Sequence, residues 1–167
     1  MIFLTVWVPM NTHTHTTGYF NMYSNQLTGT IPSNLRWRKL FLLDLGRNQL
    51  TGTLPVDLGE KFVALRHLAL DHNQFTGTLP SSYINVGNGR VESLHLNDNQ
   101  LTGEVPGDHL LLNKIVQYTL QNNNFEGKID KDTCKAEVFH TGEMVEFKTD
   151  CDICSCKSIW CEDDYCF

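Results

Sequence analysis

The sequence predicts an α/β-type solenoid that is mostly β, with short 3₁₀ or helical pieces, in which five right-handed coils stack into a parallel concave sheet. Three observations lead to this fold. Asparagines recur at a spacing near 24 residues, a Leu-x-Leu pattern precedes each of them, and all 6 cysteines lie in the last 34 residues. We expect three segments: an apolar and Thr/His-rich segment over residues 1–16, the solenoid over 17–130, and a Cys-rich C-terminal cap over 131–167.

The first segment opens with the apolar run MIFLTVWVPM over residues 1–10. This run is too short to span a bilayer. It also lacks the basic residues and the small-residue cleavage site that are typical of a signal peptide. We therefore interpret it as a start that cuts into a longer array of coils.

The repeat is built around one asparagine per coil. Apolar residues stand five and three positions before each of these asparagines, as Leu43 and Leu45 do in the second coil. An apolar–polar alternation of period two predicts a short strand with its leucines facing inward. Stacked strands of this kind form a parallel sheet. The five asparagines, with intervals of 23, 25, 26 and 24 residues, are Asn25, Asn48, Asn73, Asn99 and Asn123.

Each of these asparagines falls where a strand bends into a turn. A buried amide at such a place can hydrogen bond to backbone groups of its own coil and of the neighbouring coil, so that no buried polar group of the turn is left unsatisfied. We expect the five side chains to form an interior ladder with a structural role and no part in ligand binding.

The segment after each asparagine has its own pattern, Leu-Thr-Gly-x-Leu-Pro, as at residues 50–55. A glycine recurs at one phase in every coil, which suits a bend or a close approach of two backbones. A proline recurs three residues later in four coils and ends the extended segment. The convex side should therefore carry short extended or 3₁₀ pieces and no long helices.

The string LFLLDLGRNQLTGTLP at residues 40–55 resembles the plant-type leucine-rich repeats of receptor-kinase ectodomains and polygalacturonase-inhibitor proteins. The resemblance covers residues 17–130, and the Cys-rich cap also resembles caps of secreted repeat proteins. It implies a location outside the cell or on its surface, and recognition of a protein, peptide or glycan. The family's N-terminal pair of cysteines is missing here, as a truncated start would explain. This chain contains neither a kinase domain nor a membrane anchor.

Charge is distributed unevenly along the chain. The net charge of −6 arises from 13 Lys and Arg against 19 Asp and Glu, and residues 130–167 hold ten of the acids with four lysines. The remaining nine acids and nine bases leave the repeats neutral. Without a basic stripe the protein is not expected to bind nucleic acid or an anionic membrane.

The six cysteines lie in a short polar segment, which indicates a disulfide framework formed in an oxidising compartment. Six cysteines allow 15 pairings, and the sequence does not choose among them. The Cys-x-x-Cys-x-Cys spacing also suits zinc, but no histidine or second Cys pair stands at finger-like spacing. We therefore expect no metal and no cofactor. The disulfide candidates are Cys134, Cys151, Cys154, Cys156, Cys161 and Cys166.

The outward positions of the strands, which lie six, four, two and one residues before each asparagine, form the concave surface where solenoids usually bind partners. Their polar centre and two flanking tyrosines, of the kind that anchor interfaces, give our candidate ligand-binding set. It comprises Tyr19, Tyr23, Asp44, Arg47, His67, Asp71, His72, His95 and Asp98.

Other interpretations stay open at this stage. The concave face can be an ordinary solvated sheet surface, and the chain can be a structural fragment of a longer receptor-like ectodomain. Thr-Gly-Thr recurs in three coils, at residues 28–30, 51–53 and 76–78, and its ranks of hydroxyls suggest ice or surface binding as an alternative. We expect no enzyme activity, because the histidines and aspartates lack a nucleophile and an enclosing pocket. The sequence leaves the oligomeric state open.

Overall fold

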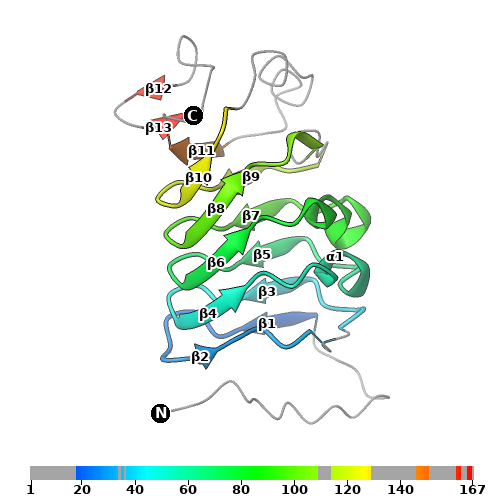
Figure 1. Ribbon diagram of the computed structural model, residues 1–167. Coiled ribbons are helices and arrows are strands. Elements are labelled where there is room, and N and C mark those ends of the chain that lie inside the picture. Colours follow the sequence, from blue (N-terminus) through cyan, green and yellow to red (C-terminus); the bar gives the residue numbers. More distant parts are fainter. Residues whose placement is uncertain are drawn as a thin grey trace.

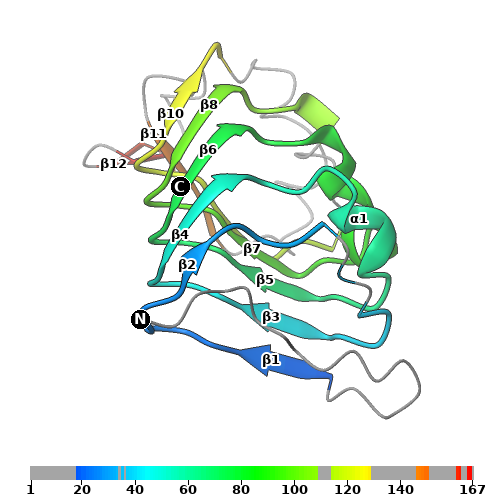
Figure 2. The same ribbon diagram turned by 60° about the horizontal axis from the view of Figure 1, so that its bottom comes forward.

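The computed structural model describes residues 18–33, 35, 37–108, 114–128, 146–150, 161–162 and 165–166. These residues wind into coils that stack along one axis, with a concave sheet on one side and short helices on the other (Figures 1 and 2). The expected segment 1–16 lies outside the described residues, as does most of 131–167.

The first strand of each coil contributes to one parallel sheet. Its register aligns Phe20, Leu43, Leu68, Leu94 and Tyr118 across the five coils. The parallel sheet predicted from the Leu-x-Leu pattern is therefore confirmed. Its strands are β1 (Tyr19–Asn21), β3 (Leu42–Asp44), β5 (His67–Ala69), β7 (Ser93–His95) and β9 (Gln117–Thr119).

The Leu-Thr-Gly segments form a second parallel sheet beside the first. Its strands are β2 (Thr28–Gly29), β4 (Gln49–Thr53), β6 (Gln74–Thr78), β8 (Gln100–Glu104) and β10 (Asn124–Glu126). The convex side holds α1 (Leu58–Lys61) and the 3₁₀ helix η1 (Ser81–Asn88). The expectation of short pieces in place of long helices is confirmed for the described residues.

The core is a column of repeated leucines between the two sheets and the convex side. Leu50, Leu65, Leu68 and Leu70 are completely buried. Burying a leucine side chain contributes about 1.5–3 kcal/mol, so this stack is the main source of stability. Aromatic residues replace leucine near the first coil, where the ring of Trp37 meets the ring of Phe62 edge-on at 6.0 Å.

The concave sheet continues into the segment expected to be the cap. Strand β11 (Glu146–Asp150) pairs in parallel with β9 and places Phe147 beside Tyr118 in register. Two short antiparallel strands follow, β12 (Cys161–Glu162) and β13 (Tyr165–Cys166), with β13 paired to β11. A strand from the Cys-rich segment thus extends the sheet of the repeats. The side chains of the six cysteines lie outside the description.

The ladder asparagines bind backbone groups of two coils at once. Asn73 accepts the N–H of Leu50 at 2.9 Å, and its amide nitrogen donates to the carbonyls of Leu45, Leu70 and Asp71 at 3.0–3.2 Å. Leu45 and Leu50 belong to the preceding coil, so each side chain links its coil to the previous one. Asn48, Asn99 and Asn123 make the same four contacts.

The expectation of five interior asparagines is wrong for the first coil. Asn48, Asn73 and Asn99 are buried and Asn123 is partly buried, but Asn25 is exposed. Its amide donates only to the carbonyls of Met22 and Tyr23 in its own coil. The reason is geometric, because the ladder contact needs a preceding coil and no described residues form one.

Candidate functional site

The concave sheet presents its outward side chains in columns that run across the coils. The strand register aligns Asn21, Asp44, Ala69, His95 and Thr119 in one column. Parallel strands lie about 4.8 Å apart, so each side chain neighbours the equivalent one in the next coil. Residues about 25 positions apart in the sequence therefore form one continuous surface.

A shallow, open depression of about 360 Å³ lies on this surface. Four of its lining residues belong to the predicted binding set, namely Tyr23, Asp44, Asp71 and His95. Sequence reasoning missed the other four as site residues, although it had placed all of them at outward positions. They are Ala69, Asn97, Thr119 and Gln121.

The missed residues have a common signal. They stand four or two positions before the asparagine of their coil, as do all eight lining residues. Choosing residues by charge favoured the ionisable side chains over these small and neutral ones. Column position was the better guide to the depression.

Tyr19 and His67, from the column six positions before the asparagine, lie outside the lining. The ring of Tyr19 lies 5.7 Å from that of Phe41, and the ring of His67 lies 5.3 Å from the same phenylalanine. His67 Nδ1 also lies 2.9 Å from the Ser93 hydroxyl, and its Nε2 lies 3.9 Å from Glu92. These contacts form one flank of the concave face.

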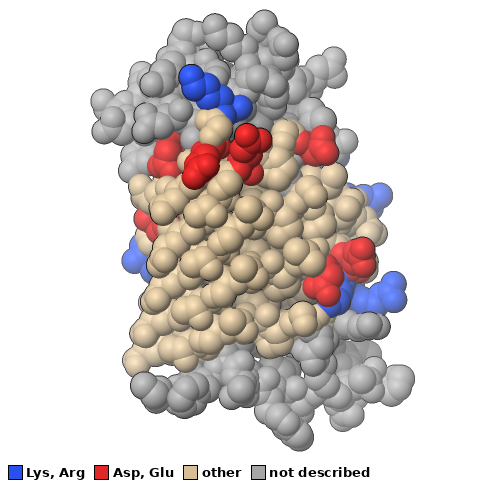
Figure 3. All heavy atoms as spheres, in the orientation of Figure 1, with Lys and Arg blue, Asp and Glu red and all other residues tan. Residues whose placement is uncertain are grey.

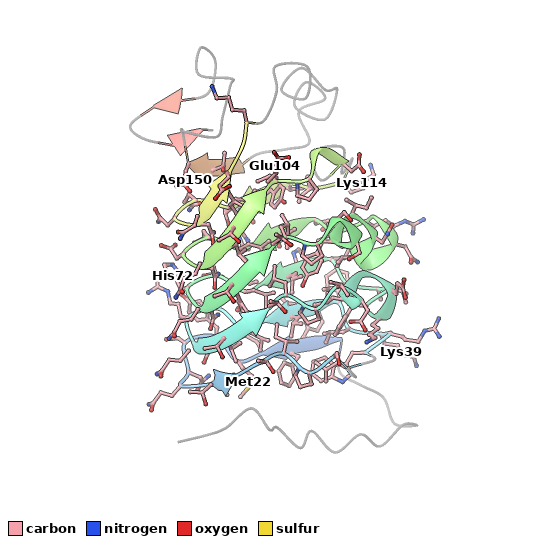
Figure 4. All side chains as sticks on the ribbon, viewed as in Figure 1. Met22, Lys39, His72, Glu104, Lys114 and Asp150 are labelled. Atoms are coloured by element: carbon pink, nitrogen blue, oxygen red, sulfur yellow. The ribbon has the colours of Figure 1, made fainter. Side chains whose placement is uncertain are left out.

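Arg47, His72 and Asp98 stand directly before the asparagine of their coil and form the opposite flank, where the chain turns toward the second sheet; Figure 4 labels His72 at this edge. Their φ angles are 52°, 50° and 54°, in the left-handed region that most residues other than glycine avoid. The Arg47 guanidinium lies 5.9 Å from the centre of the Tyr23 ring. His72 Nε2 lies 3.4 Å from Asp98 and 4.0 Å from Asp71.

A chain of hydrogen bonds orients the polar groups at one end of the depression. The Asn97 amide nitrogen donates to Asp98 Oδ2 at 2.7 Å, which turns its oxygen toward Thr119. The Thr119 hydroxyl donates to that oxygen at 2.7 Å and lies 3.0 Å from His95 Nδ1. A hydroxyl has one hydrogen to donate, so His95 Nδ1 must carry the proton of its bond to Thr119.

Asp71 is the most enclosed carboxylate of the depression, with 16% of its side chain exposed. Burial raises the pKa of this carboxyl, and the negative charge of Asp44 adds to the increase; the Asp71 backbone N–H, His72 and His95 act in the opposite direction. Gly46 makes room for the carboxylate, since a Cβ at that residue would lie 2.7 Å from Asp71 Oδ1.

The depression suits binding better than catalysis. Its lining offers carboxylates, amides, a hydroxyl, an imidazole and an aromatic ring, and it is open to solvent. No group of three or more His, Cys, Asp or Glu side chains suited to a metal ion occurs in the described part of the chain.

The outer face of the second sheet is the other regular surface, and it is uncharged over β4 and β6 (Figure 3). Internal contacts explain its repeated threonines. The Thr51 hydroxyl donates to the Gly29 carbonyl at 3.3 Å, and the Thr76 hydroxyl to that of Gly52 at 3.4 Å. These hydroxyls link successive coils, so the pattern needs no ligand to account for it.

Among the described residues, none of the helices has the length and apolar character needed to cross a membrane.

Comparison with known proteins identifies the repeat. The family model described as Leucine Rich Repeat matches residues 39–60, 64–85 and 90–110. These matches cover three of the coils described above. A search of the curated proteins found no match to this chain.

Solved plant receptor structures share the fold. The BIR2 ectodomain from Arabidopsis thaliana is 26% identical with a TM-score of 0.65, over 75% of this chain and 65% of that one. The ectodomain of the receptor kinase GASSHO1/SCHENGEN3 from Arabidopsis thaliana, solved with CASPARIAN STRIP INTEGRITY FACTOR 2, is 32% identical with a TM-score of 0.65. That match covers 77% of this chain and only 15% of the ectodomain.

A third similar structure is the plant peptide hormone receptor RGFR1 in complex with RGF2. It is 30% identical with a TM-score of 0.65, over 78% of this chain and 20% of the receptor chain. The chain thus spans less than two thirds of the length of each of these structures.

Proposed function

Because the chain is a plant-type leucine-rich repeat protein, we propose that it is a non-catalytic recognition module that binds a peptide or protein segment on its concave sheet, outside the cell. The depression between Tyr23 and Gln121 is the observation that carries this proposal. It spans four coils, so an extended segment lying across the strands can reach side chains from all of them.

The similar receptor structures support the same class of ligand. The titles of two of them name a peptide or factor in complex, RGF2 with RGFR1 and CASPARIAN STRIP INTEGRITY FACTOR 2 with GASSHO1/SCHENGEN3. A glycan remains compatible with a polar concave surface, but a pocket that combines an aromatic wall with carboxylates and amides suits the varied side chains of a peptide.

The test is selection of random dodecapeptides displayed on phage against the full chain, followed by binding measurements with variants. Ala69→Phe fills the depression from its floor, and the matched control Gln74→Phe places the same bulk on the exposed outer face of β6. We expect Ala69→Phe to weaken the selected peptides at least about tenfold, or 1.4 kcal/mol, and Gln74→Phe to leave them unchanged. Peptides insensitive to Ala69→Phe would contradict concave binding.

A further inference from the structure

The polar groups of the depression are mainly acceptors without donors. Its eight lining residues include the carboxylates of Asp44 and Asp71 and contain neither lysine nor arginine. The Gln121 side-chain oxygen, also in the lining, is buried and has no hydrogen-bond partner in the described part of the protein. A buried acceptor left unpaired costs about 1–3 kcal/mol, so such a group indicates that a donor completes the site.

The two carboxylates differ in how well they are satisfied. Asp44 accepts from the Gly46 N–H at 3.0 Å and from the Asn21 amide at 3.2 Å, so each of its oxygens has a partner. The nearest cationic group to Asp71 is His72 Nε2 at 4.0 Å, beyond hydrogen-bond distance. Asp71 therefore carries a largely enclosed charge, and the absence of a side chain at Gly46 keeps space for it.

Tyr23 gives the depression an aromatic wall that already receives a guanidinium. The Arg47 group lies 5.9 Å from the centre of its ring. Arginine in the left-handed region, where Arg47 has φ 52°, is uncommon. The contact indicates that the Tyr23 ring is placed to stack with a planar cation.

We infer that the depression binds the guanidinium of an arginine side chain in the peptide or protein ligand. A guanidinium offers five N–H donors in one plane and stacks on aromatic rings, which matches the Asp71 carboxylate, the unpaired Gln121 oxygen and the Tyr23 ring. A bare metal ion fits less well, because the described residues hold no metal-binding cluster. The inference rests on the proposed concave binding and names the ligand group that it recognises.

The experiment uses the selected dodecapeptides on the full chain. We expect the enriched peptides to share an arginine. Replacing that arginine by citrulline, which keeps the shape and loses the charge, should weaken binding to the wild type about tenfold, or 1.4 kcal/mol. The same replacement should have little effect on Asp71→Asn. The control Glu60→Gln, which removes a carboxylate from the exposed side of α1, should keep the full wild-type preference for arginine.

The outcomes separate this inference from the function on which it rests. Enriched peptides without arginine, or equal loss with citrulline in the wild type and in Asp71→Asn, would overturn the arginine site while sensitivity to Ala69→Phe upholds concave binding. Peptides that accept lysine in place of arginine without loss would also overturn it, because a lysine cannot supply the planar set of donors. Insensitivity to Ala69→Phe would remove both.

Discussion

The carboxylate of Asp150 accepts a hydrogen bond from the backbone N–H of Asn122, with 2.9 Å between Oδ1 and N. Its second oxygen lies 3.4 Å from the backbone nitrogen of Asn123. In the earlier coils the equivalent N–H groups donate to carbonyls of the next coil, as Arg47 does to Asp71 at 3.0 Å. One side chain thus replaces two backbone carbonyls where the repeats end (Figure 4).

Replacing this carboxylate should loosen the last coil. Asp150→Ala leaves the two N–H groups without their acceptor, and each buried unpaired group costs about 1–3 kcal/mol. We expect faster hydrogen exchange at the amides of Asn122 and Asn123, with little change at those of Asn48 and Asn73. Asp108→Ala, at an exposed position, serves as the control. Unchanged exchange at both amides would show that Asp150 does not cap the array.

The two environments of the repeated asparagine predict two different costs for one substitution. Asn73→Ala removes four hydrogen bonds to buried backbone groups of two coils, so we expect a loss of about 3 kcal/mol or more. Asn25→Ala removes only contacts within an exposed turn, and its loss should stay below about 1 kcal/mol. Urea unfolding of the two variants measures both values, and equal losses would contradict a ladder that joins coils.

The glycine of each coil has two separate reasons to be a glycine. Gly52 has φ +82°, and a Cβ there would lie 2.7 Å from the methyl carbon of Thr30. Gly29 has φ +89° with nothing within 4 Å of such a Cβ. Gly29→Ala should therefore cost only the backbone strain, about 1 kcal/mol, and Gly52→Ala should cost clearly more.

A double-mutant cycle separates the two causes. Thr30→Ser removes the methyl group, so Gly52→Ala in that background should cost about as much as Gly29→Ala. The measurement is the free energy of unfolding of the four proteins in the cycle. If Thr30→Ser recovers none of the loss, the contact between Thr30 and Gly52 is not the second cause.

Asp71 should cost stability at neutral pH. Burial raises the pKa of its carboxyl above the ordinary value of 3.8, so the folded protein holds this proton more tightly than the unfolded chain does. The folded state therefore loses stability as the pH rises from about 3.8 through the raised pKa. An asparagine has no charge to bury at any pH.

We therefore expect Asp71→Asn to be more stable than the wild type at pH 7, by about 0.5 kcal/mol or more, with the difference disappearing toward pH 3. Thermal unfolding at several pH values measures it, with Glu60→Gln as the control that should show no such trend. A variant less stable than the wild type at pH 7 would mean that the contacts of the carboxylate outweigh the cost of burying it.

The sequence by itself determined the coils, the parallel sheet, the asparagine positions and the columns of outward side chains. These features depend on local alternation and on a repeat of about 24 residues, and both can be read without knowing any contact. The same information placed all eight lining residues of the depression at outward positions, but it could not select them. It named Tyr23, Asp44, Asp71 and His95 and missed Ala69, Asn97, Thr119 and Gln121.

Only the tertiary structure decided how these groups act together. That Asn97 turns its oxygen to Thr119 depends on Asp98, and that Asp71 has space depends on the missing side chain of Gly46. Asp150 follows no asparagine of the repeat, so no periodic signal connects it with Asn122, 28 residues earlier. A periodic pattern specifies equivalent positions, whereas hydrogen bonds and burial depend on which different residues occupy neighbouring coils.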